Sequence, residues 1–461
     1  MTRRAGRTRQ LITALVAALA LAPAACGVVG GKGTDPQTEA VGHDPVQGSL
    51  FDSSVVHTLD VQVDEADVAA MISEYETSGE KTWIPGTVTI DGTELSDVGL
   101  RLKGNSSLST LDADADPATL PWLVRLDKYV DGQSYRDITS FVVRSNITTT
   151  AVNEAVALEL IELAGLASQQ ATSVRLTVND GTARLRLVIE NPDEDWASSV
   201  FDSPGLLYKS EARGDWSYRG DDPASYTDVF DQQAGEDDLT PLIELLDFVN
   251  NADDATFAAE LADRVDVEAF ARYLAVQELV GNFDTISGPG NNSYLWYDAE
   301  TEVFTVVSWD QNLSFGITPM AGGMGGGPGV GGSLPDGMDP GNPPAMPEGF
   351  DPGDLPEGFD PDNPPEGFDP DNPPEGFDPG DLPAGGMGGM GSNILEERFR
   401  ATPELAALYD EAVADLTAEL IDSGVAAEVL ATWVAVLTEH AGDLVDTATI
   451  EQDAAAVAAY L

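Results

Sequence analysis

Carboxylate and amide side chains gather in three short segments of the second half of the chain. These segments are Gly281-Asn282-Phe283-Asp284, Asn291-Asn292-Ser293-Tyr294 and Ser308-Trp309-Asp310-Gln311-Asn312. Asp284 follows a predicted helix, Asn292 begins a predicted strand, and Asp310 ends the next strand, so a hairpin would bring the three side chains together. Phosphoryl transfer needs a carboxylate that orients and deprotonates the attacking hydroxyl, and oxygen ligands that hold magnesium on the phosphates.

The same spacing has a plainer structural interpretation, because Asp and Asn cap helices and turns in any acidic protein. Spacing alone favours that interpretation. Other chemistries have less support, since the chain has only three histidines, His43, His57 and His440. A Ser-His-Asp arrangement and a multi-histidine metal site are therefore poorly supported. No Gly-x-x-x-x-Gly-Lys-Ser/Thr loop occurs, which excludes an ordinary P-loop NTPase.

The charge balance restricts the possible partners. The 461 residues include 80 acidic and 22 basic side chains, giving a formal net charge of -58. Like charges repel, so the chain should bind neither nucleic acid nor an anionic bilayer through a basic surface. Basic peptides, metal cations or uncharged molecules remain as partners. The acidity also has a simple alternative explanation, which is solubility in salt.

The N-terminus resembles an export signal. Arg3, Arg4, Arg7 and Arg9 precede an apolar run over residues 11–22, which is followed by Pro23-Ala24-Ala25-Cys26-Gly27. Cys26 is the only cysteine, so neither an intramolecular disulfide nor a thiolate zinc cluster can form. A cysteine at the cleavage point is typical of a bacterial lipobox, where it would be acylated. We therefore expect a membrane-anchored, extracytoplasmic lipoprotein, with simple secretion as the alternative because Pro23 departs from the usual aliphatic residue.

Periodicity predicts an α+β protein. After the signal peptide (1–26) and a flexible tether (27–54), the first part of the folded region is mainly sheet. The expected strands are 57–63, 87–90, 97–102, 123–126, 140–143, 173–178 and 183–189, and the expected helices are 65–75 and 152–164. The later part is mainly helical. The expected helices are 239–250, 254–264, 267–279, 394–400, 404–422, 426–440 and 451–460, interrupted by a strand pair at 292–297 and 303–308.

Residues 317–392 interrupt the helical part and lack the composition of a packed core. Gly, Pro, Met and Asp dominate there, and Pro-Glu-Gly-Phe-Asp-Pro recurs at Pro347, Pro356, Pro365 and Pro374. We predict a disordered insertion with nine-residue repeats. Calcium binding is an alternative because the aspartates are closely spaced, although the glycine-aspartate pattern of calcium β-rolls is absent.

Several segments resemble the CotH family of atypical secreted protein kinases. Trp309-Asp310-x-Asn312-x-x-Phe315-Gly316 is similar to that family's Trp-Asp-x-Asp-x-x-Phe/Trp-Gly motif. Further blocks in the right order are Arg101-Leu102-Lys103-Gly104-Asn105-Ser106-Ser107, Asn153-Glu154 to Gly165, Val178-Asn179, Ile189-Glu190, Leu207-Tyr208-Lys209, Asn282-Phe283-Asp284, and Asn292 followed by Tyr294-Leu295-Trp296-Tyr297. The resemblance is nearly continuous over 55–316 and resumes at 393–461, which together would form one kinase-like domain.

The resemblance implies a two-lobed, atypical protein-kinase-like fold that uses ATP with Mg²⁺ or Mn²⁺. By position, Asp284 would be the catalytic base, and Asn292, Asp310 and Asn312 would bind the metal. Glu154 would orient a cation that contacts the phosphates, for which Arg125 is the candidate. Lys209 and Lys103 are the next candidates for that contact, and Glu190 is placed with Arg125 and Lys209 among the nucleotide-binding residues.

Three departures from the family pattern put activity in doubt. The strand with Arg125 lacks the usual lysine, Asn312 replaces an aspartate, and the gap between Asp284 and Asn292 is long. The first hypothesis is an extracytoplasmic kinase that phosphorylates hydroxyls of envelope or surface proteins. The alternative is a catalytically weak surface lipoprotein that keeps the fold as a binding or structural module.

Overall fold

The computed structural model describes residues 48–461 apart from 105, 109–114, 213, 289 and 318–392. Contacts divide the chain into two units, Met1–Glu39 and Ala40–Leu461, and every described residue belongs to the second. The signal peptide with Cys26, most of the tether, and nearly all of the repeat insertion therefore lie outside the described residues.

Seven strands form a closed barrel in the order β1-β2-β3-β4-β5-β7-β6. They are β1 (His57–Val63), β2 (Ile84–Ile90), β3 (Thr93–Leu102), β4 (Trp122–Arg125), β5 (Ser140–Val143), β6 (Ala171–Val178) and β7 (Arg184–Glu190). Neighbouring strands pair in antiparallel fashion except β1 and β6, which are parallel and join the two ends of the sheet. Leu59 lies opposite Leu176 in that parallel pair. Closure leaves the barrel without a free edge.

A second sheet has four strands in the order β11-β10-β8-β9. They are β8 (Gly205–Ser210), β9 (Phe230–Ala234), β10 (Ser293–Asp298) and β11 (Val303–Ser308), all antiparallel to their neighbours. The β10–β11 hairpin places Ser293 opposite Ser308, so Asn292 and Trp309 lie at the same end of the sheet. The N–H of Trp309 donates to the carbonyl of Asn292 at 3.1 Å, which extends the pairing by one residue.

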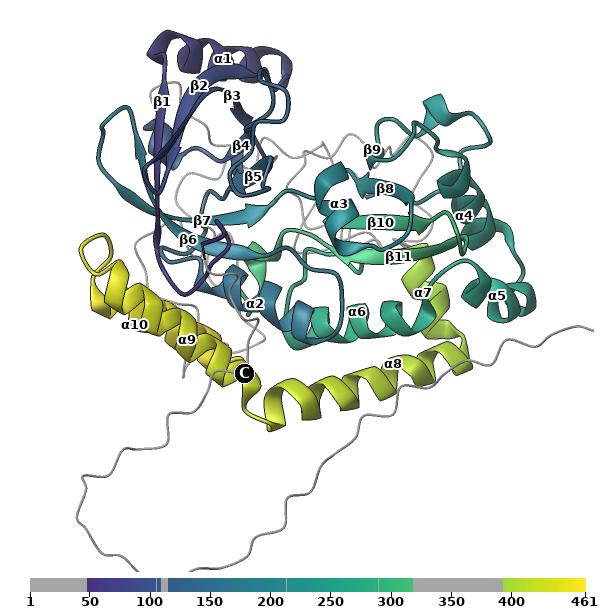
Figure 1. Cartoon of the computed structure of the whole chain (residues 1–461). Helices are drawn as coiled ribbons and strands as arrows, with labels where there is room; N and C mark the ends of the chain where they lie inside the picture. Colours follow the sequence, from purple (N-terminus) through teal and green to yellow (C-terminus); the bar gives the residue numbers. More distant parts are fainter. Residues whose placement is uncertain (1–47, 105, 109–114, 213, 289, 318–392) are drawn as a thin grey trace, which may run out of the picture. The chain divides into compact units, whose positions relative to one another are not determined.

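Helices cover both sheets, as Figure 1 shows for α1 beside the barrel and α6 beneath β10 and β11. The helices are α1 (Glu65–Ser78), α2 (Val152–Leu163), α3 (Glu194–Val200), α4 (Thr240–Asn251), α5 (Asp254–Glu260), α6 (Val267–Leu279), α7 (Ile394–Ala401), α8 (Pro403–Leu416), α9 (Val425–His440) and α10 (Thr447–Ala458). A π-helical turn, Thr417–Asp422, continues α8. Among the described residues no single helix could cross a membrane by length and composition; α8 with its π turn passes that test only jointly with α9, across a 47° bend.

Alternation along the barrel strands produces two hydrophobic cores. On β5, Phe141 and Val143 lie in the core that fills the barrel, whereas Val142 lies in the core shared with the helices and the second sheet. Successive strand residues point to opposite faces, so β4, β5, β6 and β7 contribute to both cores, whereas the buried apolar residues of β1, β2 and β3 lie in the barrel core. Helix α2 lies between the barrel and helices α6, α9 and α10, and most of its residues are buried. Its buried residues are mostly apolar, but they also include Asn153 and Glu154.

The α+β class and most of the expected elements are confirmed, with small shifts at their ends. Three elements were missed: α3, β8 and β9. The end of the expected tether is also corrected, because Leu50 and Phe51 are buried in the barrel core. The closed barrel was not expected, and the two-lobed kinase-like arrangement stays a prediction.

A substitution of Phe141 would test how much the barrel core contributes to the stability of the fold. The ring of Phe141 is fully buried, so Phe141→Ala should lower the free energy of unfolding by about 3–5 kcal/mol through lost burial and a cavity. Tyr129→Ala is the control, because 47% of Tyr129 is exposed. Urea unfolding followed by circular dichroism measures both variants. Equal losses would show that Phe141 does not support the barrel.

Candidate functional site

Arg144 joins three elements at the centre of the candidate site. It follows β5 directly, and its Nε lies 2.9 Å from Oε1 of Glu154 in the first turn of α2. Its Nη2 donates to Oδ1 of Asp310, which follows β11. Arg144 and Glu154 are buried, and Asp310 is about one-quarter exposed at its side chain (24%). One guanidinium therefore stands between two carboxylates that are 10 and 166 residues away in the chain.

Burial and the shared cation shift the pKa values of this group. Burial raises the pKa of Glu154 to about 6, and the adjacent Arg144 opposes the rise. Burial would lower the pKa of Arg144, but attraction to Asp310 and Glu154 outweighs it and raises that pKa. Arg144 therefore stays charged, and its positive charge offsets part of the free-energy cost of burying the carboxylate of Glu154.

Asp284, Asn292 and Asp310 converge beside this ion pair. Burial, followed by the charge of Asp310, raises the pKa of Asp284 to about 6, whereas a hydrogen bond from Asn292 lowers it. The Asn292 Nδ2 also donates to the main-chain oxygen of Asp284 at 2.9 Å. The hairpin expected from the sequence thus brings these three residues together.

The turns that present these side chains have unusual backbones. Asn292 and Asp310 both adopt left-handed conformations, with φ of 52° and 58°. Asn and Asp tolerate this region better than most residues, and strained conformations cluster at functional sites. Asn282 stabilises the arrangement, because its amide nitrogen donates to Oε1 of Gln311 at 3.1 Å and its Oδ1 accepts from the N–H of Asp284 at 3.3 Å.

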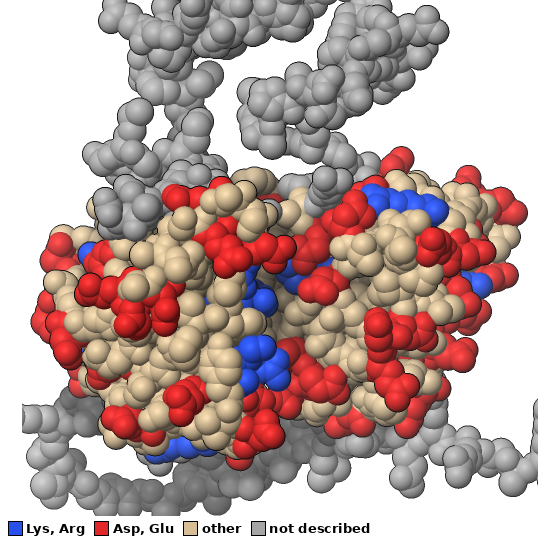
Figure 2. All heavy atoms as spheres, turned by 90° about the horizontal axis from the view of Figure 1, so that it is seen from above, with Lys and Arg blue, Asp and Glu red and all other residues tan. Residues whose placement is uncertain are grey.

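Four positively charged side chains form a basic cluster, defined as Lys81, Arg101, Lys103 and Lys209. The charges of Lys209 and Arg101 act on both Lys81 and Lys103. Burial, followed by the charges of Lys209, Arg101 and Lys81, lowers the pKa of Lys103 to about 7. The Nζ of Lys103 lies 5.4 Å from the ring centroid of Trp309, and Lys209 contacts Glu211 at 2.6 Å. Among the described residues, Lys81 and Lys103 form no salt bridge, although the charge of Glu211 acts on both. Figure 2 shows basic side chains gathered in a hollow of an otherwise mainly acidic face.

Arg125 and Glu190, which the sequence predicts to bind the nucleotide, contact residues outside the carboxylate and basic clusters. Arg125 has a half-exposed side chain (51%) and binds Asp127 at 2.8 Å. The expected partnership between Glu154 and Arg125 is therefore wrong, because β4 turns Arg125 outward while Arg144 reaches Glu154. Glu190 accepts hydrogen bonds from the N–H of Gln170 at 2.8 Å and Nε1 of Trp196 at 3.2 Å. The remaining candidate, Asn312, accepts through its main-chain oxygen from Asn153 at 2.7 Å.

Sequence reasoning missed Arg144, Lys81 and the role of Arg101. One signal was available for Arg144: it directly follows an apolar strand and precedes Glu154 of the next helix by ten residues. An arginine at the end of a buried strand needs an acidic partner nearby. The sequence offered many acidic partners, so this signal did not single out Glu154 and Asp310.

The donor set fits a divalent cation only in part. Burial and, after it, repulsion from Asp310 raise the pKa of Asp284, and a cation between the two carboxylates would relieve that repulsion. Among the described residues, however, no group of three or more His, Cys, Asp or Glu side chains could hold a metal ion. A cation here would need the amide oxygen of Asn292, water and substrate phosphates, which is how Mg²⁺ is commonly held.

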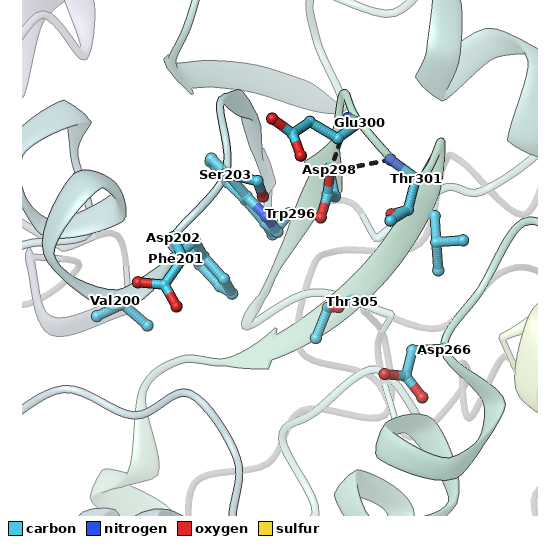
Figure 3. Close-up of a pocket in the computed structure, with 11 residues that line it drawn as sticks. Val200, Phe201, Asp202, Ser203, Asp266, Trp296, Asp298, Glu300, Thr301 and Thr305 are labelled. Carbon is cyan, nitrogen blue, oxygen red and sulfur yellow. Dashed lines mark hydrogen bonds between the residues drawn. The ribbon is translucent and has the colours of Figure 1, made fainter. Parts of the chain in front are cut away.

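A cavity that the sequence did not predict lies elsewhere. Its volume is about 390 Å³, and it is lined by the α3–β8 connection and the β10–β11 turn, as Figure 3 shows. None of the residues that the sequence predicts for the site lines it. The cavity is therefore separate from the carboxylate and basic clusters.

The fold and the site define an α+β protein that brings paired carboxylates next to lysines and arginines, as phosphate-handling proteins do. The family model described as "CotH kinase protein" matches residues 100–343, which is 244 of the 461 residues. The chain belongs to the CotH kinase protein family, and this membership supports a kinase-like function. The match includes Arg144, Glu154, Asp284 and Asp310. No curated protein matches the chain.

Arg144 is expected to be essential for stability as well as for the site. Arg144→Met would leave Glu154, which is only 1% exposed, without its cation. Removing one partner of a buried ion pair costs about 3–5 kcal/mol. Arg144→Met/Glu154→Leu should recover part of that loss, because the fully buried carboxylate is removed and only Asp310, about one-quarter exposed, is left without the cation. Urea unfolding at neutral pH gives the free energies.

Arg125→Met is the matched control, since it breaks an exposed pair worth at most about 1 kcal/mol. If Arg144→Met costs no more than Arg125→Met, the buried bridge does not stabilise the fold. If the double variant is no more stable than Arg144→Met, the unpaired charge of Glu154 is not the cause.

Glu190 should make stability fall as pH rises. Burial raises the pKa of Glu190 to about 7 from an ordinary 4.5. Because the folded pKa is higher, the protonated form favours folding, and this contribution is lost as pH rises through 7. Glu190→Gln should therefore raise Tm at pH 8 and change it little below pH 5. Thermal unfolding across this range is the measurement. Glu94→Gln on an exposed position of β3 is the control, and an equal Tm increase in that variant would contradict the prediction.

Proposed function

We propose that this protein is an extracytoplasmic, CotH-like protein kinase that transfers the γ-phosphate of ATP to hydroxyls of envelope or surface proteins. In this proposal the barrel and the second sheet with its helices correspond to the two lobes of an atypical protein-kinase-like fold. The basic cluster and the carboxylates lie where residues of both parts come together, since Lys103 follows β3 and Lys209 lies on β8.

The observation that carries the proposal is the set of closely spaced cations in a chain of net charge -58. Like charges held close together cost free energy, and an anion with several negative oxygens relieves that cost. Among the described residues Lys103 and Lys81 form no salt bridge, although the charge of Glu211 acts on both, so their ammonium groups are available to such an anion. A nucleoside triphosphate provides the required charge density.

The carboxylates supply the remaining chemistry. Asp284 would accept the proton of the substrate hydroxyl. As it does so, the hydroxyl oxygen bonds to the γ-phosphorus of ATP, and the bond between that phosphorus and the oxygen that leaves with ADP breaks. Its pKa of about 6 suits a base that works near neutral pH. Asp310 and Asn292 would hold Mg²⁺ or Mn²⁺, which offsets the charge of the phosphates when bound. Arg144 would fix the position of Asp310.

The proposed extracytoplasmic location rests on the N-terminal sequence. The Arg-rich start, the apolar run over 11–22 and Cys26 support export and lipid anchoring on the extracytoplasmic face, with secretion without an anchor as the alternative. Substrates would then be proteins of the cell envelope. The strongly acidic chain argues against nucleic acid as a partner.

One observation favours the second candidate, a catalytically weak binding module. Asp310 already forms an ion pair with Arg144, and Asn312 brings no negative charge. Fewer free negative charges weaken metal binding and therefore the chemistry that depends on it. In this case the fold would bind a phosphate-bearing ligand or a protein without transferring a phosphoryl group.

A labelled-ATP assay distinguishes the active kinase from the binding module. The purified full chain, with Mg²⁺ or Mn²⁺, should label itself or added Ser-, Thr- and Tyr-containing peptides. Asp284→Asn and Asp310→Asn should each reduce labelling by about 100-fold or more, since each removes a group that acts in the transfer. Asp410→Asn, an exposed residue of α8, serves as the control and should leave labelling unchanged.

Labelling that survives both substitutions would overturn the assigned roles. Absence of labelling together with an ATP-induced rise in Tm that Lys103→Met abolishes would support the binding module. Absence of both labelling and any ATP effect would remove the nucleotide from the proposal.

A further inference from the structure

The cavity of about 390 Å³ has an aromatic floor. Phe201 and Trp296 stack with ring centroids 4.4 Å apart and planes within 4° of parallel, and Figure 3 shows the two rings side by side. Gly205 allows this arrangement, because a Cβ there would come within 2.4 Å of Cζ2 of Trp296. The floor is therefore built by close packing.

Trp296 carries an unused donor at this floor. Its side chain lines the cavity and the residue is only 4% exposed. The indoles of Trp122, Trp196, Trp216 and Trp433 each donate a hydrogen bond. The indole N–H of Trp296 has no acceptor among the described residues. The Trp296 nitrogen is not among the described buried atoms that lack a partner, so solvent reaches it where the side chain lines the cavity. A ligand carbonyl in the cavity would accept a hydrogen bond from it.

Four carboxylates surround the cavity, and two of them already have structural roles. Asp298 accepts from the N–H of Glu300 at 2.7 Å and shapes the β10–β11 turn. Asp266 accepts from the N–H of Ala269 at 3.0 Å and caps α6. In the part of the chain that the structure describes, the carboxylates of Asp202 and Glu300 have no hydrogen-bond or ion-pair partner. Their charges are available to a cationic ligand.

The residues that line the cavity indicate which type of cation it would bind. Within the described residues no three acidic side chains are arranged to hold a metal ion. An aromatic floor below separated carboxylates instead suits a flat organic cation, which stacks on a ring and donates several hydrogen bonds at its edge. The arginine guanidinium has this shape, and the main chain beside it supplies a carbonyl for Trp296.

We infer that this cavity binds an arginine side chain of a partner protein. The guanidinium stacks on the Phe201–Trp296 pair and bonds to Asp202 and Glu300, while Trp296 donates to a main-chain carbonyl of the same segment. The site lies at the opposite end of β10 from Asn292, roughly 20 Å away at about 3.3 Å per residue. A bound segment would therefore dock without occupying the carboxylate cluster. This inference stands apart from phosphoryl transfer.

Fluorescence anisotropy with a labelled Gly/Ser peptide carrying two adjacent arginines tests it, using the full chain without nucleotide at physiological salt. Asp202→Asn/Glu300→Gln should raise Kd about tenfold, since two charge-assisted contacts are lost. Phe201→Leu should raise Kd for this peptide more than Kd for its lysine counterpart, because only the planar guanidinium loses a stacking partner.

Asp410→Asn/Glu411→Gln is the matched control, because it removes the same charge from exposed positions of α8. It should change Kd less than about twofold, since long-range attraction is largely screened at this salt concentration. An equal loss in this control would show attraction to net charge only and would overturn the site. Unchanged binding in Asp202→Asn/Glu300→Gln, or displacement of the peptide by Ca²⁺ alone, would also overturn it. Circular dichroism confirms that each variant is folded.

Discussion

The buried bridge from Glu154 through Arg144 to Asp310 is the interaction on which the site depends. Each ion alone would cost several kcal/mol to bury, so the three side chains are stable there only together. They come from a barrel strand end, a helix and the connection after β11. The bridge therefore couples the barrel to the second sheet, and the position of Asp310 depends on the packing of α2.

The basic cluster shows how a strongly acidic chain can still attract an anion. Charges separated by more than about 8 Å are screened at physiological salt, whereas neighbouring and partly buried charges are not. The net charge of -58 is distributed over the whole chain, but Lys81, Arg101, Lys103 and Lys209 act at short range. A phosphate group would respond mainly to these four cations, because most acidic side chains are too distant to oppose them.

The β10–β11 hairpin connects the two candidate sites. One end carries Asn292 and Asp310, and the other end carries the turn that lines the cavity around Trp296. β10 pairs on both sides, with β8 and β11, so the hairpin is held within the sheet. If the proposed docking role of the cavity holds, a rigid spacing between it and the candidate site would suit action on one segment of a protein while another is held.

The sequence by itself determined the α+β class, most strands and helices, and the convergence of Asp284, Asn292 and Asp310, because periodicity and hairpin spacing are local properties. It did not reveal β9, where Asp231, Gln232 and Gln233 interrupt any apolar alternation. Only the tertiary structure decided that Arg144, and not Arg125, pairs with Glu154, since strand register sets which side chain points inward. It also decided the closure of the barrel, which pairs β1 with a strand more than 100 residues later. Such contacts depend on the whole packed chain, and a local pattern cannot specify them.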